Sequence, residues 1–345
     1  MTSKETSNLG IKERLNGYLA EKCQSRAKAT ALTGDASDRQ YFRLLIENQP
    51  SQVLALYKGP IQFDSLPFVN VAKLFSKVPI RVPRILDHSD RFGILALEDL
   101  GDITLQAYLK KSPQATHNQI YKQAVSVINI LQQRGKELTS NNYIPFNIAF
   151  DERTLAAELD FFTKHFIESY QGSSLTTVTK NALAKEYQDL VVELACEPRV
   201  LCHRDYHSRN LMLHQDQLYV IDFQDARLGP ETYDLVSLLR DSYWDVSENQ
   251  VNKLVSYFLS LQQTSNEKVV PQNILVEFRR KFDLMALQRN LKALGTFGFQ
   301  KTVRGNSSYV QHIPRTLGYI RSNLTRYPRF LRLRDLLSDH CKELQ

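Results

Sequence analysis

Residues 201–213, LCHRDYHSRNLML, place a polar loop between two apolar flanks. The flanks have the short hydrophobic character of buried β-strands. Between them stand His203, Asp205 and Asn210. Loops that are held by a rigid scaffold carry much of the chemistry of proteins, so this loop is the first candidate for a functional site.

The polar residues of this loop have a spacing that predicts phosphoryl transfer. His203, Asp205 and Asn210 match H-R-D-x-x-x-x-N, the catalytic-loop pattern of kinases, and Asp222 follows twelve residues later in the apolar run LYVIDF. Asp205 would accept or orient the proton of an acceptor hydroxyl. Asn210 and Asp222 would supply oxygen ligands to Mg²⁺, which neutralises the phosphates of ATP. His203 is expected to brace the loop backbone.

Two kinds of hydrophobic pattern divide the chain. Short β-leaning segments and one helix fill the first third, and from about residue 101 the apolar period becomes helical. One helix, with apolar residues from Ile120 to Leu131, is expected to stop at Gly135. Further helices are expected near 152–169, 176–195, 231–242, 248–262 and 272–298.

These patterns predict an α/β (α+β) fold with two lobes, and the family resemblance described below implies that it is of the protein-kinase-like kind. Residues 1–100, including an N-terminal helix, would form a small antiparallel sheet lobe that binds nucleotide. Residues 101–345 would form a larger, mainly helical lobe that carries catalysis and acceptor binding.

The composition narrows the class of protein. The 345 residues carry a formal net charge of +7, which suits an acidic partner such as a nucleotide. The first residues lack the apolar stretch of a secretory signal, and no run approaches the roughly 18 apolar residues of a membrane span. The four cysteines, which are scattered without CxxC pairs, favour a reducing cytoplasm over a disulfide or zinc framework.

Much of the basic excess lies near the carboxyl end, in RTLGYIRSNLTRYPRFLRLRDLL. One interpretation is a pair of amphipathic helices with a solvated basic face. The alternative is a surface that meets phosphate or nucleic acid, and salt-dependent binding to DNA or RNA would reveal it. The arginines concerned are Arg315, Arg321, Arg326, Arg329, Arg332 and Arg334.

Beyond this pattern, DYHSRNLM followed by IDFQDARLGPETYDLVSLLRD resembles the aminoglycoside phosphotransferase and choline kinase superfamily. The resemblance implies that Asp234 supports the catalytic loop through backbone hydrogen bonds. Gln224 stands where protein kinases carry the glycine of D-F-G, so a protein-kinase activation switch is not indicated.

The resemblance also implies a nucleotide site in the first lobe. LTGDASDRQYFRL is similar to the strand–turn–strand that covers the phosphates, where Ser37 and Asp38 would form a phosphate-binding turn and Arg39 would add charge. An ordinary polar hairpin is the competing interpretation. Glu98 to Leu100 would offer backbone groups to adenine. Lys58 is the available strand lysine, although the following helix lacks the usual glutamate partner.

Within the superfamily, several segments from about residue 30 to 325 resemble the bacterial anomeric kinases of N-acetylmuramate and N-acetylglucosamine. That resemblance implies transfer of the γ-phosphoryl group of ATP to the C1 hydroxyl of a cell-wall amino sugar. A sugar pocket needs polar groups and an aromatic platform. The candidates are Arg240, Asp241, Trp244 and Arg289, for each of which simple packing is the alternative.

Two other functions remain open from the sequence. A catalytically silent nucleotide-binding module is favoured by the thin phosphate loop and opposed by intact Asp205, Asn210 and Asp222. A kinase of the same fold could instead act on choline, an aminoglycoside or another sugar, although the basic charge disfavours cationic substrates. The sequence specifies no oligomeric state.

Overall fold

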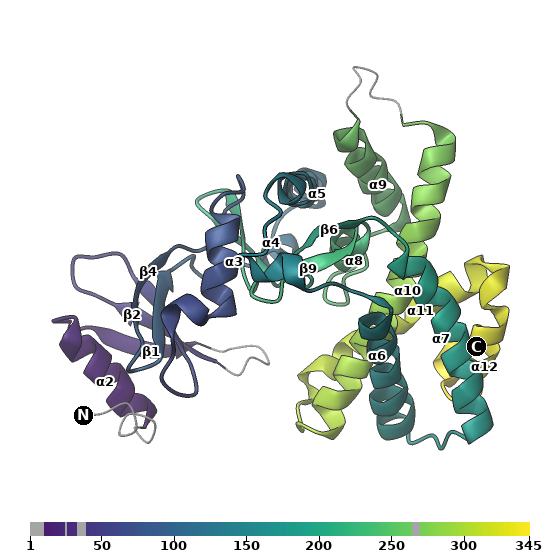
Figure 1. The fold of residues 1–345 in the computed structure, drawn as a ribbon, viewed down its shortest axis with the longest axis horizontal. Coiled ribbons are helices and arrows are strands. Elements are labelled where there is room, and N and C mark those ends of the chain that lie inside the picture. The colour runs from purple at the N-terminus through teal and green to yellow at the C-terminus, as the bar shows by residue number, and fades with distance from the viewer. Residues whose placement is uncertain (1–9, 25, 33–38, 264–269) are drawn as a thin grey trace. The chain divides into compact units, whose positions relative to one another are not determined.

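The computed structural model describes residues 10–24, 26–32, 39–263 and 270–345. They form two compact units (Figure 1). The first unit comprises the chain up to Ile103 together with Met212–Gln224, and the second comprises Thr104–Leu211 and Asp225–Gln345. The antiparallel sheet and the mainly helical remainder confirm the predicted fold class.

A five-stranded antiparallel sheet forms the body of the first unit. Its spatial order is β1-β2-β3-β5-β4. The amino-terminal helix packs against it through Leu15, Tyr18 and Leu19, which join a core with Leu54 and Ile94. The elements are α2 (Ile11–Glu21), β1 (Lys28–Leu32), β2 (Gln40–Leu45), β3 (Gln52–Leu56), η1 (Phe63–Ser65), α3 (Pro67–Phe75), β4 (Ile85–Ser89) and β5 (Ile94–Glu98).

A buried arginine fixes the turn before β5. Arg14 of α2 donates hydrogen bonds to the carbonyls of Phe92 and Tyr57, each at 2.8 Å. Gly93 has φ +62°, and a Cβ there would lie 1.9 Å from the carbonyl oxygen of Gly59. Only glycine fits this close approach of two chain segments.

The hairpin that follows the catalytic loop belongs to the first unit. Its strands are β7 (Leu211–His214) and β8 (Gln217–Val220). The N–H of Val220 donates to the carbonyl of Arg81 at 2.8 Å, and Leu213 does the same to Ile103. Residues 212–224, which the sequence placed in the second domain, therefore pack with the first unit.

The second unit is mainly helical, with α10 at its centre (Figure 1). Residues 282–291 of α10 are all buried. Helices α6, α8 and α11 pack around it. The helices are α4 (Leu105–Lys111), α5 (Gln114–Glu137), α6 (Glu152–Phe162), the π-helix η3 (Thr163–Tyr170), α7 (Thr177–Ala195), α8 (Tyr233–Leu239), α9 (Glu248–Gln262), α10 (Gln272–Thr302), α11 (Ile313–Arg326) and α12 (Leu331–Ser338). The short turns are η2 (Ile144–Asn147), η4 (Ser307–His312), η5 (Pro328–Phe330) and η6 (Lys342–Leu344).

A two-stranded sheet of β6 (Arg199–Cys202) and β9 (Arg227–Pro230) carries the catalytic loop. Helix α5 runs past Gly135 to Glu137, so the predicted stop at this glycine was wrong. A Cβ at Gly135 would lie 2.6 Å from the Cβ of Leu201. The glycine is needed because it lets α5 approach β6 closely.

The carboxyl-terminal arginines are held within the second unit. Arg315 donates to the carbonyl of Ser242 at 3.0 Å, and the other contacts are ion pairs with carboxylates. Arg321 is exposed. The pairs are Arg326 with Asp283 and Glu248, Arg329 with Glu193, Arg332 with Glu186 and Arg334 with Asp335.

Among the helices that the structure describes, none is long and apolar enough to cross a membrane.

Glu197, between α7 and β6, gives a prediction for stability. It is 7% exposed and accepts a hydrogen bond from the Thr232 hydroxyl at 3.3 Å. Burial raises its pKa to about 7. Folding therefore favours the protonated form, and this contribution is complete at low pH and is lost as pH rises through 7. Relative to wild type, Glu197→Gln should gain about 2 kcal/mol of unfolding free energy at pH 8 and little at pH 4.5.

Urea unfolding at the two pH values measures this difference. Asp189→Asn, at an exposed position of α7, is the matched control and should show no such pH dependence. An equal effect of Glu197→Gln at both pH values would contradict the prediction.

Candidate functional site

Asp234 fixes the start of the catalytic loop. This fully buried carboxylate, in the first turn of α8, accepts hydrogen bonds from the backbone N–H groups of His203 at 2.6 Å and Arg204 at 3.0 Å. Arg204 has φ +85°, a left-handed conformation that non-glycine residues seldom adopt. The hydrogen bonds predicted for Asp234 are confirmed, and they turn the chain sharply after β6.

A second buried carboxylate holds the far side of the loop. Asp241, 1% exposed, accepts from the N–H of Ser208 at 2.9 Å and from that of Tyr243 at 2.8 Å. Both of its oxygens are engaged by backbone groups. Asp241 therefore supports the loop backbone, and its predicted contact with the acceptor stays a prediction.

Asp205 lies on this braced loop with its side chain 29% exposed. Lys292 Nζ is 3.7 Å from its Oδ1, and Arg204 Nε is 4.0 Å from its Oδ2. Burial by itself would raise the pKa of Asp205, but the positive charges of Lys292 and Arg204 outweigh it and hold the pKa well below its ordinary value. The carboxylate is therefore ionised at neutral pH.

Asn210 closes the loop on itself. Its Nδ2 donates to the backbone oxygen of Asp205 at 2.9 Å, and its N–H donates to the carbonyl of His207 at 2.9 Å. With its nitrogen directed at the loop, the amide oxygen of Asn210 is the group available to a cation. Burial lowers the pKa of His207 to about 3, so this ring is neutral.

His203 is completely buried. Its ring meets that of Tyr206 edge-on at 5.7 Å, and the hydroxyl of Tyr206 donates to the carbonyl of Ala124 at 2.9 Å. These contacts suit the predicted bracing role, because they tie the loop to α5.

In the first unit, Asp222 follows β8 in a left-handed conformation with φ +62°. Its side chain is 43% exposed, and Arg39 Nη2 lies 3.6 Å from its Oδ1. The next residue, Phe223, is fully buried between the rings of Phe68 and Phe75, at centroid distances of 4.7 and 5.4 Å. Phe223 thus anchors the segment and presents the Asp222 carboxylate at its surface.

The predicted nucleotide residues have different surroundings. Arg39 is largely covered, with its guanidinium 5.8 Å from the rings of Tyr41, Tyr57 and Phe68. Lys58 lies beyond the end of β3 and is exposed. Ser37 and Asp38 lie outside the described residues.

The predicted adenine-binding segment begins at the end of β5. Glu98 has its N–H engaged by the carbonyl of Arg84 at 2.9 Å, and its side chain pairs with the same arginine. Leu100 is buried.

The remaining acceptor candidates are mostly packed. Arg240 is 5% exposed, pairs with Glu248 at 2.6 Å and lies over the ring of Tyr319. Its predicted contact with the acceptor stays a prediction. Trp244 is half-buried and meets His117 edge-on at 5.9 Å. Arg289 is buried, and its Nε has no hydrogen-bond partner among the described residues.

The donor chemistry of Asn210 and Asp222 fits Mg²⁺. Asn210 offers an amide oxygen and Asp222 offers a carboxylate, and Mg²⁺ prefers such hard oxygen ligands. Proteins often supply only one or two ligands to Mg²⁺, because phosphates and water complete its coordination shell. Among the described residues, no group of three or more histidine, cysteine or acidic side chains is placed to hold a metal ion.

Lys292 is a site residue that the sequence reasoning missed. It lies on α10 three residues after Arg289, a spacing that puts both side chains on one helix face. This spacing was the feature of the sequence that could have pointed to Lys292. The contact with Asp205 is not readable from it, because the two residues are 87 positions apart.

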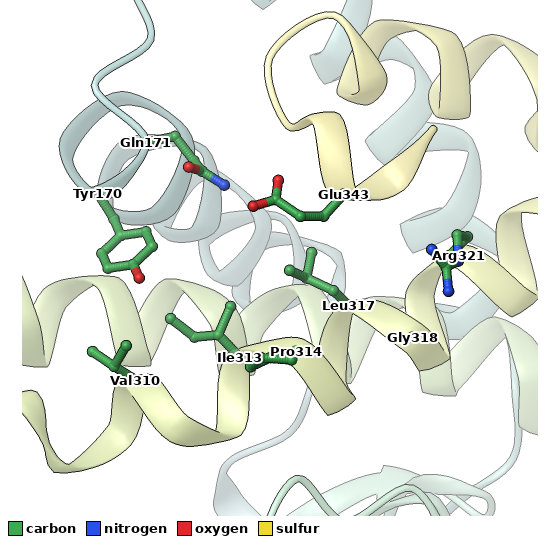
Figure 2. A pocket seen from close by; sticks show the side chains of 9 residues that line it. All are labelled: Tyr170, Gln171, Val310, Ile313, Pro314, Leu317, Gly318, Arg321 and Glu343. Atoms are coloured by element: carbon green, nitrogen blue, oxygen red, sulfur yellow. The ribbon is translucent and has the colours of Figure 1, made fainter.

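A separate cavity of about 360 Å³ lies between the end of η3 and α11 (Figure 2). Figure 2 shows the side chains of Gln171 and Glu343 on either side of it, with the apolar Ile313 and Leu317 along α11. None of the predicted site residues lines this cavity.

Comparison with known proteins places the chain among phosphotransferases. Residues 28–264 match the model of the APH family, described as the phosphotransferase enzyme family. The chain is 32% identical to the N-acetylmuramate/N-acetylglucosamine kinase of Neisseria meningitidis serogroup B over 309 residues, 89% of each protein. It is also 32% identical to that of Pseudomonas aeruginosa over 313 residues, 90% of this chain and 88% of the relative.

Solved structures share the fold at low identity. An ADP-bound aminoglycoside phosphotransferase superposes with a TM-score of 0.59 at 15% identity, covering 90% of this chain and 98% of that one. Choline kinase from Cryptosporidium parvum gives 0.59 at 15% identity, covering 91% and 94%. These similarities establish the two-lobed kinase-like fold.

The two hydrogen bonds to Asp234 predict a large stability effect. Asp234→Ala would leave two N–H groups without their acceptor and should lower the free energy of unfolding by about 3 kcal/mol. Asp234→Asn keeps one acceptor oxygen and should lose less. Urea unfolding of the three proteins measures the order, and an alanine variant as stable as wild type would contradict it.

Proposed function

The chain belongs to the phosphotransferase enzyme family, and we propose that it transfers the γ-phosphoryl group of ATP, with Mg²⁺, to the C1 hydroxyl of N-acetylmuramate or N-acetylglucosamine. The observation that carries the proposal is the 32% identity, over about nine-tenths of the chain, to relatives named as kinases of these two sugars. The ionised Asp205, held on a braced loop, is the group that the reaction requires.

In this reaction Asp205 acts on the acceptor hydroxyl. Its carboxylate accepts the hydroxyl proton as the sugar oxygen bonds to the γ-phosphorus, and the bond from that phosphorus to the β–γ bridging oxygen breaks to release ADP. A base must lie within hydrogen-bonding reach of the proton that it removes. The partial exposure of Asp205 is consistent with this requirement, whereas the two carboxylates that support the loop, Asp234 and Asp241, are buried.

We assign the Mg²⁺ ligands to Asn210 and Asp222. Bound Mg²⁺ would neutralise charge on the phosphates and so favour departure of ADP. The amide of Asn210 is oriented by its hydrogen bond to the backbone of Asp205. The carboxylate of Asp222 is oriented by the burial of Phe223 and by the amide of Gln224, which donates to it at 2.9 Å.

Nucleotide binding is assigned to the first unit. Arg39 is a cation beside Asp222, and its position among aromatic rings limits its motion. Ser37 and Asp38 would complete a phosphate-binding turn, and Glu98 to Leu100 would border adenine. Lys58 is the alternative cation. Of the two, Arg39 is favoured because its side chain is largely covered and lies against a carboxylate that we assign to the metal.

The acceptor is assigned to the second unit. Arg289 is a buried cation that could pair with the lactyl carboxylate of N-acetylmuramate, and Trp244 supplies a half-exposed aromatic face.

We place the reaction in the cytoplasm, in recycling of cell-wall sugars, where the cysteines would stay reduced. All four are free thiols: Cys23, Cys196, Cys202 and Cys341.

Asp205→Asn tests the catalytic assignment. Phosphorus NMR with Mg-ATP and a panel of amino sugars, choline and aminoglycosides should show a sugar-1-phosphate signal with wild type. The variant should lose on the order of 10³-fold in rate, because the neutral amide cannot take the proton. Its ATP affinity should stay close to that of wild type.

Other outcomes of this experiment would contradict parts of the proposed function. Phosphorylation of choline or an aminoglycoside alone would reject the sugar assignment, and Mg-ATP binding without turnover on any acceptor would favour the silent module. A fully active Asp205→Asn would remove Asp205 from catalysis.

A second comparison separates the two candidate phosphate cations. Arg39→Met should raise the KM for ATP about tenfold, the loss of one charge-assisted contact to phosphate. Lys58→Met should change it little. Steady-state kinetics at saturating sugar gives both values, and the reverse order would move the assignment to Lys58.

A further inference from the structure

The contact between Lys292 and Asp205 joins two distant parts of the second unit. Lys292 comes from α10, directly after its buried segment, and its side chain is 19% exposed. Its Nζ lies 3.7 Å from Oδ1 of Asp205. This distance is that of an ion pair but longer than a direct hydrogen bond. The carboxylate therefore keeps hydrogen-bonding capacity for a ligand.

The fold of the catalytic loop does not depend on this ion pair. The loop backbone is already fixed by Asp234 at His203 and Arg204, and by Asp241 at Ser208. Asn210 closes it from within. The charge of Lys292 acts on the side chain of Asp205, which these contacts leave partly exposed.

The charges around Asp205 are mostly positive. Arg204 approaches its Oδ2 and is itself paired with Asp225 at 3.3 Å, so part of the Arg204 charge is already neutralised. Arg289 contributes from inside α10, and His207 is neutral. Unlike Arg204, Lys292 forms an ion pair with no other carboxylate among the described residues.

Phosphoryl transfer brings two anions together. A carboxylate that orients the acceptor hydroxyl must lie next to a γ-phosphoryl group that is itself negative, and like charges at such distances repel strongly in a partly buried site. A cation beside the carboxylate reduces this repulsion. It also restricts rotation of the side chain, so that the free oxygen faces the hydroxyl.

We propose that Lys292 is a positioning residue for Asp205: it holds the carboxylate through Oδ1 and offsets its charge as the phosphoryl group approaches. This inference rests on the proposed function. Lys292 lies beyond residues 28–264, the part of the chain that matches the family model, so the assignment comes from this structure and not from the family pattern.

The test compares Lys292→Met, Lys292→Arg and wild type in steady-state sugar phosphorylation with Mg-ATP. The methionine variant keeps most of the apolar stem and loses the charge. Its kcat should fall about 100-fold, with each KM within about threefold of wild type, because the charge acts on the reacting complex. Lys292→Arg should recover kcat to within about tenfold of wild type.

Lys301→Met is the matched control. Lys301 lies on the same helix, is exposed and donates to the hydroxyl of Ser307 at 2.9 Å, and its loss should leave kcat unchanged. Thermal unfolding of each variant verifies that it is folded. Lys292→Gln is the second neutral variant, to be used if the methionine variant fails to fold, and it should show the same loss.

A double-mutant cycle shows whether Lys292 acts through Asp205. Lys292→Met should have less than about a twofold effect on the residual rate of Asp205→Asn, because the partner charge is gone. Additive losses, or a kcat for Lys292→Met within threefold of wild type, would overturn the proposal. Activity of wild type and of Asp205→Asn separately decides the proposed function, so the two failures are distinguishable.

Discussion

The buried carboxylate of Asp234 is the constraint on which the candidate site depends. Burying an ionised group is costly unless its oxygens are hydrogen-bonded, and here two consecutive N–H groups meet that need. The location in the first turn of α8 adds a favourable interaction with the helix dipole. Because the carboxylate takes both N–H groups, the chain turns at Arg204, and Asp205 emerges partly exposed.

The interior of the second unit is polar as well as apolar. Asp283, fully buried on α10, is paired with Arg279 at 3.1 Å and Arg326 at 2.8 Å. Glu248 contacts the same two arginines and Arg240. Removing one member would leave an uncompensated buried charge, so this network ties α8, α9, α10 and α11 together. Of the arginines near the carboxyl end, this network includes Arg326.

In the first unit, an apolar anchor determines where a charge is displayed. Phe223 is held between two rings of α3, and the residue before it adopts a left-handed conformation. Asp222 is consequently at the surface, next to Arg39. The same arrangement occurs in both units: a buried group fixes the backbone, and a nearby carboxylate, Asp205 or Asp222, is left partly exposed.

The sequence by itself determined the fold class, and it predicted the residues that we assign to phosphoryl transfer. The change from period two to period 3.6 separates sheet from helix, and the local spacing of Asp205, Asn210 and Asp222 is characteristic enough to predict phosphoryl transfer. The family resemblance read from these motifs was confirmed. These features are readable because they depend on neighbours in the chain.

Only the tertiary structure decided which polar side chains form hydrogen bonds or ion pairs, and which groups are their partners. Asp241 and Arg240 look like pocket residues in the sequence, yet backbone N–H groups hold the first and Glu248 holds the second. Lys292 reaches Asp205 because α10 passes beside the catalytic loop. Contacts between residues so far apart depend on how helices pack, and hydrophobic periodicity specifies which face is buried but not which side chain it will meet.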